Sequence, residues 1–188
     1  MFREKTRALR KKQKIVEQRK EDYFHTQNGE LAVSIYGCEG IDQNNCDPYA
    51  SYYSIIFSVA PEIDNWTRAV KGSRYKGPEW NRIWLMPLQV LRRYGVKLGS
   101  NGTLLNVVLN LEVIRLTTDK NDVGTSTGMK VVGRAQIPFS LRSFGIKIQQ
   151  RVGLARLDET GFVTDGGYID VALELRKSQI NNYRKIHY

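Results

Sequence analysis

Apolar and polar residues alternate through much of this chain. In the run from Glu30 to Tyr36, the side chains of Leu31, Val33 and Ile35 point to one side of an extended backbone, and the side chains between them point to the other. This period of two is typical of a half-buried β-strand. Similar runs predict strands at residues 30–37, 49–59, 66–71, 82–87, 104–114, 130–138 and 168–175.

Turn-forming residues separate the predicted strands. Gly, Asn, Asp and Pro are concentrated in the gaps, for example at Gly77-Pro78 and from Gly95 to Gly102. Seven or eight strands divided in this way predict an antiparallel β-sandwich. The run 104–116 is long and strongly apolar, which is typical of a central strand.

The two ends of the chain differ from the middle in charge. Residues 1–28 hold nine Lys or Arg and four Asp or Glu, and residues 176–188 hold four Lys or Arg and no acid. The net charge of +10 therefore lies almost wholly in the ends. Residues 2–22 contain no Gly or Pro, which favours a helix. We expect a basic helical extension (1–28), a β-sandwich domain (29–175) and a basic C-terminal tail (176–188).

A thin apolar stripe runs along the predicted N-terminal helix. Phe2, Leu9, Val16 and Tyr23 recur every seven residues on an otherwise basic segment. Two interpretations remain open: a solvated helix that packs lightly on the domain or on another subunit, and a surface helix that binds anionic lipid or nucleic acid. Any attraction by charge would weaken with salt.

Several short motifs follow one another in a familiar order. Gly29-Glu-Leu-Ala-Val-Ser-Ile35 comes first, then Asp47-Pro48-Tyr49, Gly77-Pro-Glu-Trp-Asn81, Val132-Gly-Arg-Ala-Gln-Ile-Pro138 and Gly167-Tyr-Ile-Asp-Val-Ala-Leu-Glu-Leu175. Together they resemble the C2 domain family across residues 29–176. The resemblance implies an all-β fold, an antiparallel eight-stranded C2-like sandwich that docks on other molecules and does not catalyse a reaction.

The resemblance raises the question of calcium, which members of this family bind through aspartates of two loops. Asp42 and Asp47 match first-loop positions, and Asp119 and Asp122 lie near the third loop. Calcium takes about six to eight oxygen ligands, whereas the chain after the central strand has no Asp-x-Asp pair and holds Arg115. We therefore expect a calcium-independent or degenerate member with no cofactor. Asp42 and Asp47 would then act as turn residues, and calcium held by the four aspartates is the alternative.

Basic side chains are the other candidates for binding acidic phospholipid or another anionic partner. Each basic group near an anionic bilayer contributes about 1 kcal/mol, although charged side chains on hairpins are often only solvated. Arg68 and Lys71 would fall on opposite faces of one strand, which weakens a single patch. The candidates are Arg7, Arg10, Lys11, Lys12 and Lys14 in the N-terminal segment, Arg68, Lys71, Arg74 and Lys76 in one predicted hairpin, and Arg92 and Arg93, with Lys97, further along.

The sequence contains no set of residues typical of catalysis. Its two histidines, His25 and His187, lie in the ends, and no nucleophile elbow, phosphate-binding glycine loop or metal-ligand cluster is found. No apolar run approaches the length of a membrane span, and no secretory signal is expected. Cys38 and Cys46 are expected as two buried or half-buried thiols, with a disulfide as the alternative.

These observations predict a non-catalytic docking module that serves as a protein-interaction or scaffold subunit of a larger assembly. A protein partner is the first expectation. One alternative is a calcium-independent peripheral membrane adaptor that binds acidic phospholipid. The other is a viral-coat-like β-sandwich whose basic arm binds nucleic acid. We expect a cytoplasmic location, at a membrane surface, the cytoskeleton or the cilium.

Overall fold

Most of the described chain is β-strand. The computed structural model describes residues 29–42, 51–60, 63–72, 77–99, 103–116, 128–158 and 160–178. The strands are β1 (Gly29–Glu39), β2 (Tyr52–Ser58), β3 (Asp64–Trp66), β4 (Val70–Lys71), β5 (Glu79–Pro87), β6 (Leu104–Leu116), β7 (Met129–Leu141), β8 (Lys147–Leu157) and β9 (Val163–Lys177). One short helix, α2 (Leu88–Arg93), follows β5 directly.

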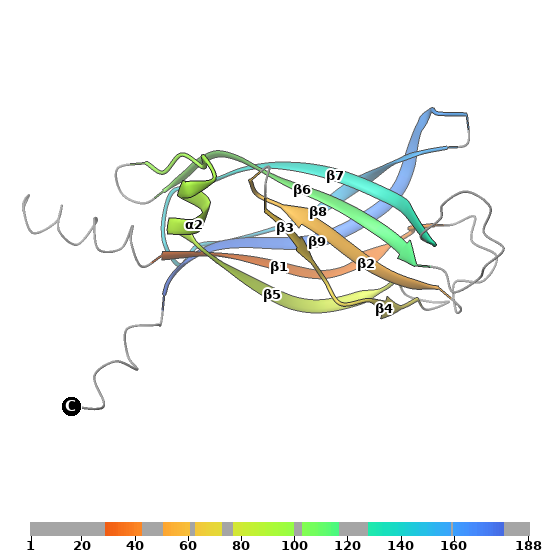
Figure 1. Ribbon diagram of the computed structural model, residues 1–188, viewed down its shortest axis with the longest axis horizontal. Helices are drawn as coiled ribbons and strands as arrows, with labels where there is room; N and C mark the ends of the chain where they lie inside the picture. The colour runs from red at the N-terminus through yellow and green to blue at the C-terminus, as the bar shows by residue number, and fades with distance from the viewer. Residues whose placement is uncertain are drawn as a thin grey trace, which may run out of the picture.

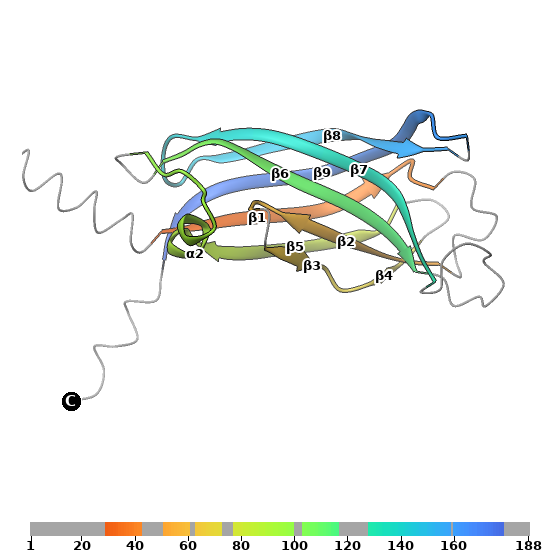
Figure 2. The same cartoon turned by 45° about the horizontal axis from the view of Figure 1, so that its top comes forward.

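The strands pair in the order β3-β2-β6-β7-β8-β9-β1-β5, with β4 also paired to β2, and every pairing is antiparallel. The sheet curls into two layers, one of β5, β1, β9 and β8 and the other of β7, β6, β2, β3 and β4 (Figures 1 and 2). Between the layers, β7 and β8 pair only at Arg134 and Ala155. The prediction of an antiparallel C2-like β-sandwich is confirmed.

Strand β1 lies in the middle of its layer, between β9 and β5. The side chains of Leu31, Val33 and Ile35 point into the core and are fully buried, as the alternation predicts. Ala32 and Ser34 on the opposite face are also buried, although a half-buried strand was expected. The reason is that both neighbouring strands flank these small side chains and leave little of them exposed to solvent.

The second layer supplies the other half of the core. Leu109, Leu111 and Val113 of β6 face inward with Ile55 and Phe57 of the neighbouring strand β2. Full burial of one such side chain contributes about 1.5–3 kcal/mol. The long apolar run at 104–116 therefore forms a central strand, in agreement with the sequence.

Side-chain contacts, and not backbone hydrogen bonds between paired strands, join β5 to the side of the sandwich that carries β3 and β4. Trp80 is buried after the Gly77-Pro78 turn, and its indole Nε1 donates a hydrogen bond to the carbonyl oxygen of Arg68 at 3.1 Å. On the same side, the ring of Trp84 meets the ring of Phe57 edge to face, with centroids 5.2 Å apart. Trp80 thus forms the apolar plug that the sequence predicts at this turn.

The structure differs from the predicted strands in three places. The predicted strand 66–71 is divided into β3 and β4, because the side-chain oxygen of Thr67 accepts the backbone N–H of Ile55 in place of a carbonyl. Strand β8 was not predicted, and neither was helix α2. The last strand ends at Lys177, two residues beyond the expected end of the domain at residue 175.

Some predictions concern parts of the chain outside the described residues. These are the helix at 2–22 with its apolar stripe, and the end of the basic C-terminal tail from residue 179 onward.

The indole of Trp80 gives a direct test of how the sandwich is closed. Trp80→Phe removes the hydrogen bond to Arg68 and leaves a void, so we expect the free energy of unfolding to fall by about 1–3 kcal/mol. Urea denaturation measures the change. The matched control is Trp66→Phe, because Trp66 is 51% exposed, and equal effects of the two substitutions would contradict this role.

Candidate functional site

Asp42 and Arg115 form a buried ion pair at the end of the sandwich where the predicted first loop begins. Strand β1 ends here, β2 begins here and β6 ends here (Figure 1). Asp42 follows β1 in a left-handed conformation, with φ of 52°. Its Oδ2 accepts hydrogen bonds from Arg115 Nη1 at 2.9 Å and from the hydroxyl of Tyr53 at 3.2 Å.

Strand register brings this cluster together. Tyr53 of β2 lies opposite Arg115 of β6, and both side chains point into the sandwich. The side chains of Arg115 and Asp42 are only 9% and 5% exposed. A buried carboxylate needs a partner of opposite charge, and Arg115 supplies it.

Of the four aspartates predicted as calcium ligands, only Asp42 lies within the described residues. Arg115 and Tyr53 both bind Oδ2 of Asp42, and a calcium ion on this carboxylate would lie beside a guanidinium of the same sign of charge. No group of three or more His, Cys, Asp or Glu within the described ranges could hold a metal. Asp47, Asp119 and Asp122 lie outside those ranges. Asp42 has the left-handed backbone of a turn residue, and within the described residues its carboxylate binds the side chains of Arg115 and Tyr53.

The energetic importance of the ion pair can be measured. Arg115→Met leaves the buried Asp42 without its cation, so we expect a loss of about 3–5 kcal/mol in the free energy of unfolding, measured with urea. Arg134→Met is the matched control, because Arg134 forms a pair with Glu112 at 2.8 Å on the surface, where removal costs about 1 kcal/mol or less. Similar losses in both variants would show that the buried pair is not a stabilising element.

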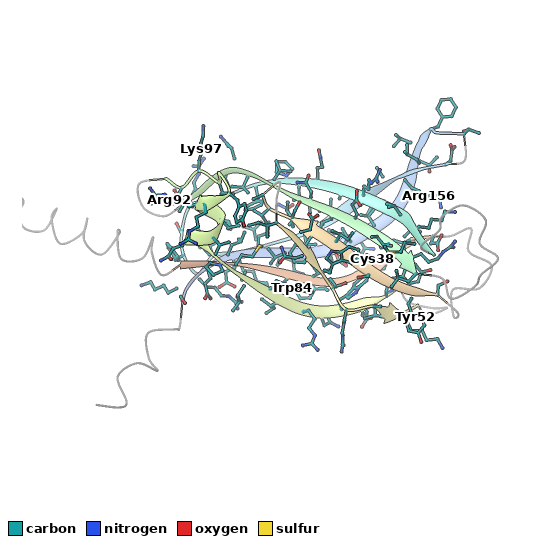
Figure 3. The ribbon with its side chains drawn as sticks, viewed as in Figure 1. Cys38, Tyr52, Trp84, Arg92, Lys97 and Arg156 are labelled. Carbon is teal, nitrogen blue, oxygen red and sulfur yellow. The ribbon has the colours of Figure 1, made fainter. Side chains whose placement is uncertain are left out.

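The predicted basic residues are divided between distant parts of the molecule. Arg68 and Lys71 are exposed near β4, and Arg92, Arg93 and Lys97 are exposed at the α2 end (Figures 1 and 3). The structure therefore does not bring these two groups into one patch. The remaining candidates, Arg7, Arg10, Lys11, Lys12, Lys14, Arg74 and Lys76, lie outside the described residues.

Several other arginines of the sandwich are paired with acids. Arg134 binds Glu112, Arg176 binds Glu174 at 2.7 Å, and Arg151 binds Glu39. Arg151 also stacks over the ring of Tyr168, 5.2 Å from its centroid. These pairs reduce the positive field of the sandwich surface.

An open groove lies beside the α2 end, and the sequence alone did not predict it. Its volume is about 730 Å³. Apolar side chains from the segment after α2 and from β6 dominate its surface. The lining residues are Val59, Tyr94, Gly95, Val96, Lys97, Leu98, Asn106, Val107, Val108 and Asn110. No acidic side chain is among them.

The β8–β9 hairpin ends in a second apolar feature, which sequence reasoning also missed. Phe162 and Val163 are each 72% exposed, and Leu157 is also exposed. Hydrogen bonds hold the turn: the N–H of Asp158 donates to the carbonyl of Phe162, and Oδ1 of Asp158 accepts the N–H groups of Thr160 and Phe162. The exposed apolar side chains thus lie beside a hydrogen-bonded turn.

Hydrogen bonding lowers the pKa of Asp158, first through the hydroxyl of Thr160 and next through the backbone N–H of Phe162. A lowered folded-state pKa means that the carboxylate stabilises the turn above its ordinary pKa of 3.8. That contribution is lost as the pH falls through the folded-state pKa.

We expect amide-exchange protection at Phe162 to fall on acidification through this range, relative to an unfolded peptide at the same pH. In Asp158→Ala, the protection should be low and independent of pH over the same range. Asp64→Ala is the control, since Asp64 is exposed on β3. Unchanged acid sensitivity in Asp158→Ala would assign the effect to another group.

Cys38 is part of the buried core and has a free thiol (Figure 3). Burial raises its pKa far above the ordinary value, and the nearby carboxylate of Asp170 adds to the shift. A thiol that stays protonated is a poor nucleophile and a poor metal ligand. Cys46, its predicted companion, lies outside the described residues.

No protein-family model matches this sequence, and no curated protein matches it. Several solved structures are similar to it. Human GIVD cytosolic phospholipase A2 is 15% identical with a TM-score of 0.48, over 80% of this chain and 17% of that chain. A C2 domain of plant Extended Synaptotagmin 1 is 14% identical with a TM-score of 0.48, over 80% of this chain and 96% of that chain. CC2D1B is 10% identical with a TM-score of 0.48, over 78% of this chain and 55% of that chain.

These similarities carry no argument about activity, and this chain spans less than a fifth of the phospholipase chain. Within the described residues, no helix has the length and apolar character needed to cross a membrane. The strand pairing and the layers of this structure are those of a C2-like β-sandwich, the fold that the motifs of the sequence predict.

Proposed function

We propose that this chain is a non-catalytic docking module that binds a protein partner without calcium, as a subunit of a larger assembly. The observation that carries the proposal is the distribution of exposed side chains. Large apolar groups are exposed at the end of the β8–β9 hairpin and along a groove. Arg134, Arg151 and Arg176 are paired with acids, and the described basic residues predicted from the sequence lie in two distant places. Exposed apolar surface of this kind is typical of protein-interaction sites.

Independence from calcium is inferred from the Asp42–Arg115 pair. Arg115 neutralises Asp42 within the protein, so this part of the loop end does not need a metal ion to offset its charge. A scaffold subunit built in this way would bind its partner at any calcium concentration.

The peripheral membrane adaptor is the second candidate, and the exposed pair Arg68 and Lys71 favours it. Two basic groups near an anionic surface contribute about 2 kcal/mol together, which alone corresponds to weak binding. The nucleic-acid alternative depends on the basic segment 1–28, which lies outside the described residues, and no described feature favours it.

Co-sedimentation of the full chain with phosphatidylserine-containing vesicles separates these functions. We expect any binding to be the same in chelator and in about 1 mM calcium. A melting curve recorded under the same two conditions should not shift, whereas bound calcium at 100 times its Kd would add about 2.7 kcal/mol of stability, a detectable change.

The paired variant Arg68→Glu/Lys71→Glu tests the second candidate. We expect it to sediment with vesicles to the same extent as the unchanged chain. Glu112→Lys, a charge change on the surface of β6, is the control for a general effect of charge. Binding that calcium switches on would overturn the proposal, and loss of binding only in Arg68→Glu/Lys71→Glu would establish the membrane adaptor instead.

A further inference from the structure

The hairpin tip is a convex, apolar and acidic feature on a basic protein. Phe162, Val163 and Leu157 are its exposed apolar side chains. The described residues of the hairpin end include two acids, Asp158 and Asp165, and one basic residue, Arg156. Such a tip is repelled by anionic lipid and attracted to an apolar surface with a basic border.

The groove beside α2 has the complementary character. Tyr94, Val96, Leu98 and Val108 provide apolar surface, and Lys97 lies in its lining. The segment 92–98 contains three basic residues and no acid. An apolar groove with a basic border is the surface that the tip requires.

The two features lie at opposite ends of the sandwich. Figure 1 shows the β8–β9 hairpin at one end and α2 at the other, and in Figure 3 Arg156 of the hairpin lies far from Arg92 and Lys97. A tip cannot reach the groove of its own chain, because the length of the sandwich separates them. The tip of one copy can reach the groove of another copy.

We propose that the hairpin tip of one copy docks in the α2 groove of the next copy, so that the chain assembles head to tail. The apolar side chains of the tip enter the groove, and Asp158 and Asp165 face Lys97 and the arginines of α2. Two different surfaces meet in this contact, so each copy keeps a free tip or a free groove. The contact therefore builds a ring if its rotation closes and a filament if it does not.

The physical terms favour a reversible contact. Hydrogen bonds join the two ends of the turn, from the N–H of Asp158 to the carbonyl of Phe162 and from the N–H of Phe162 to Oδ1 of Asp158. A preorganised element loses little conformational entropy on binding. A single turn buries less surface than a standard protein interface, so we expect association that depends on concentration and weakens with salt. This inference deepens the proposed docking function by naming a second copy as partner.

Sedimentation equilibrium of the full chain tests the inference, with concentrations from about 1 µM to about 1 mM, the affinity range of weak contacts. We expect the average mass to rise above that of the monomer. The tip variant Phe162→Ser/Val163→Ser and the groove variant Lys97→Glu/Val108→Ser should each weaken self-association at least about tenfold. Trp66→Ser, which removes an exposed aromatic side chain elsewhere, should assemble like the unchanged chain.

Mixing the two variants distinguishes head-to-tail contact from every other dimer. The tip variant keeps an intact groove and the groove variant keeps an intact tip, so an equimolar mixture should form a dimer and no larger species. Circular dichroism checks that both variants fold, and the dimer itself would show it.

Three outcomes would overturn the inference: a full chain that stays monomeric at all concentrations, a tip variant that assembles like the unchanged chain, or a mixture of folded variants that stays monomeric. A different result would overturn the proposed docking function: vesicle binding that calcium switches on, or vesicle binding that is lost in Arg68→Glu/Lys71→Glu. The two failures are therefore distinguishable.

Discussion

The two layers of this sandwich share almost no backbone pairing. Strands β7 and β8 meet in register only at Arg134 and Ala155, and on the other side the layers are joined by Trp80 and by the edge-to-face rings of Trp84 and Phe57. The layers are therefore held by side-chain packing in the core, which is close-packed and sensitive to single side chains. The loop end and the α2 end keep their positions only because this packing fixes one layer against the other.

The loop end uses that rigidity to hold a charge. Arg115 reaches Asp42 because it lies at the inward-facing end of β6, opposite Tyr53 of β2. A buried ion pair is a weak source of net stability, but removing one partner leaves an unpaired charge. The guanidinium of Arg115 thus offsets the charge of Asp42 within the protein.

The faces of the sandwich and its two ends differ in charge and in exposed apolar area. Salt bridges such as Arg176–Glu174 leave the faces of the sandwich nearly balanced, while the acidic apolar hairpin tip and the basic apolar groove lie at opposite ends. Contacts between unlike surfaces can be repeated from copy to copy, whereas a contact between like surfaces stops at a dimer. In this proposal, the protein acts by forming repeated contacts from one copy to the next.

The sequence by itself determined the strands with clear alternation, the division of charge between the ends and the middle, and the plug at Trp80. Each of these follows from local periodicity or composition. Strand β8 was missed because Gln150 interrupts its apolar alternation and only Leu154 is well buried. The tertiary structure alone decided the rest. Asp42 and Arg115 are 73 positions apart and meet only through strand register. The exposure of Phe162 likewise depends on a turn that projects from the fold, and local pattern does not encode which apolar side chains the rest of the chain leaves uncovered.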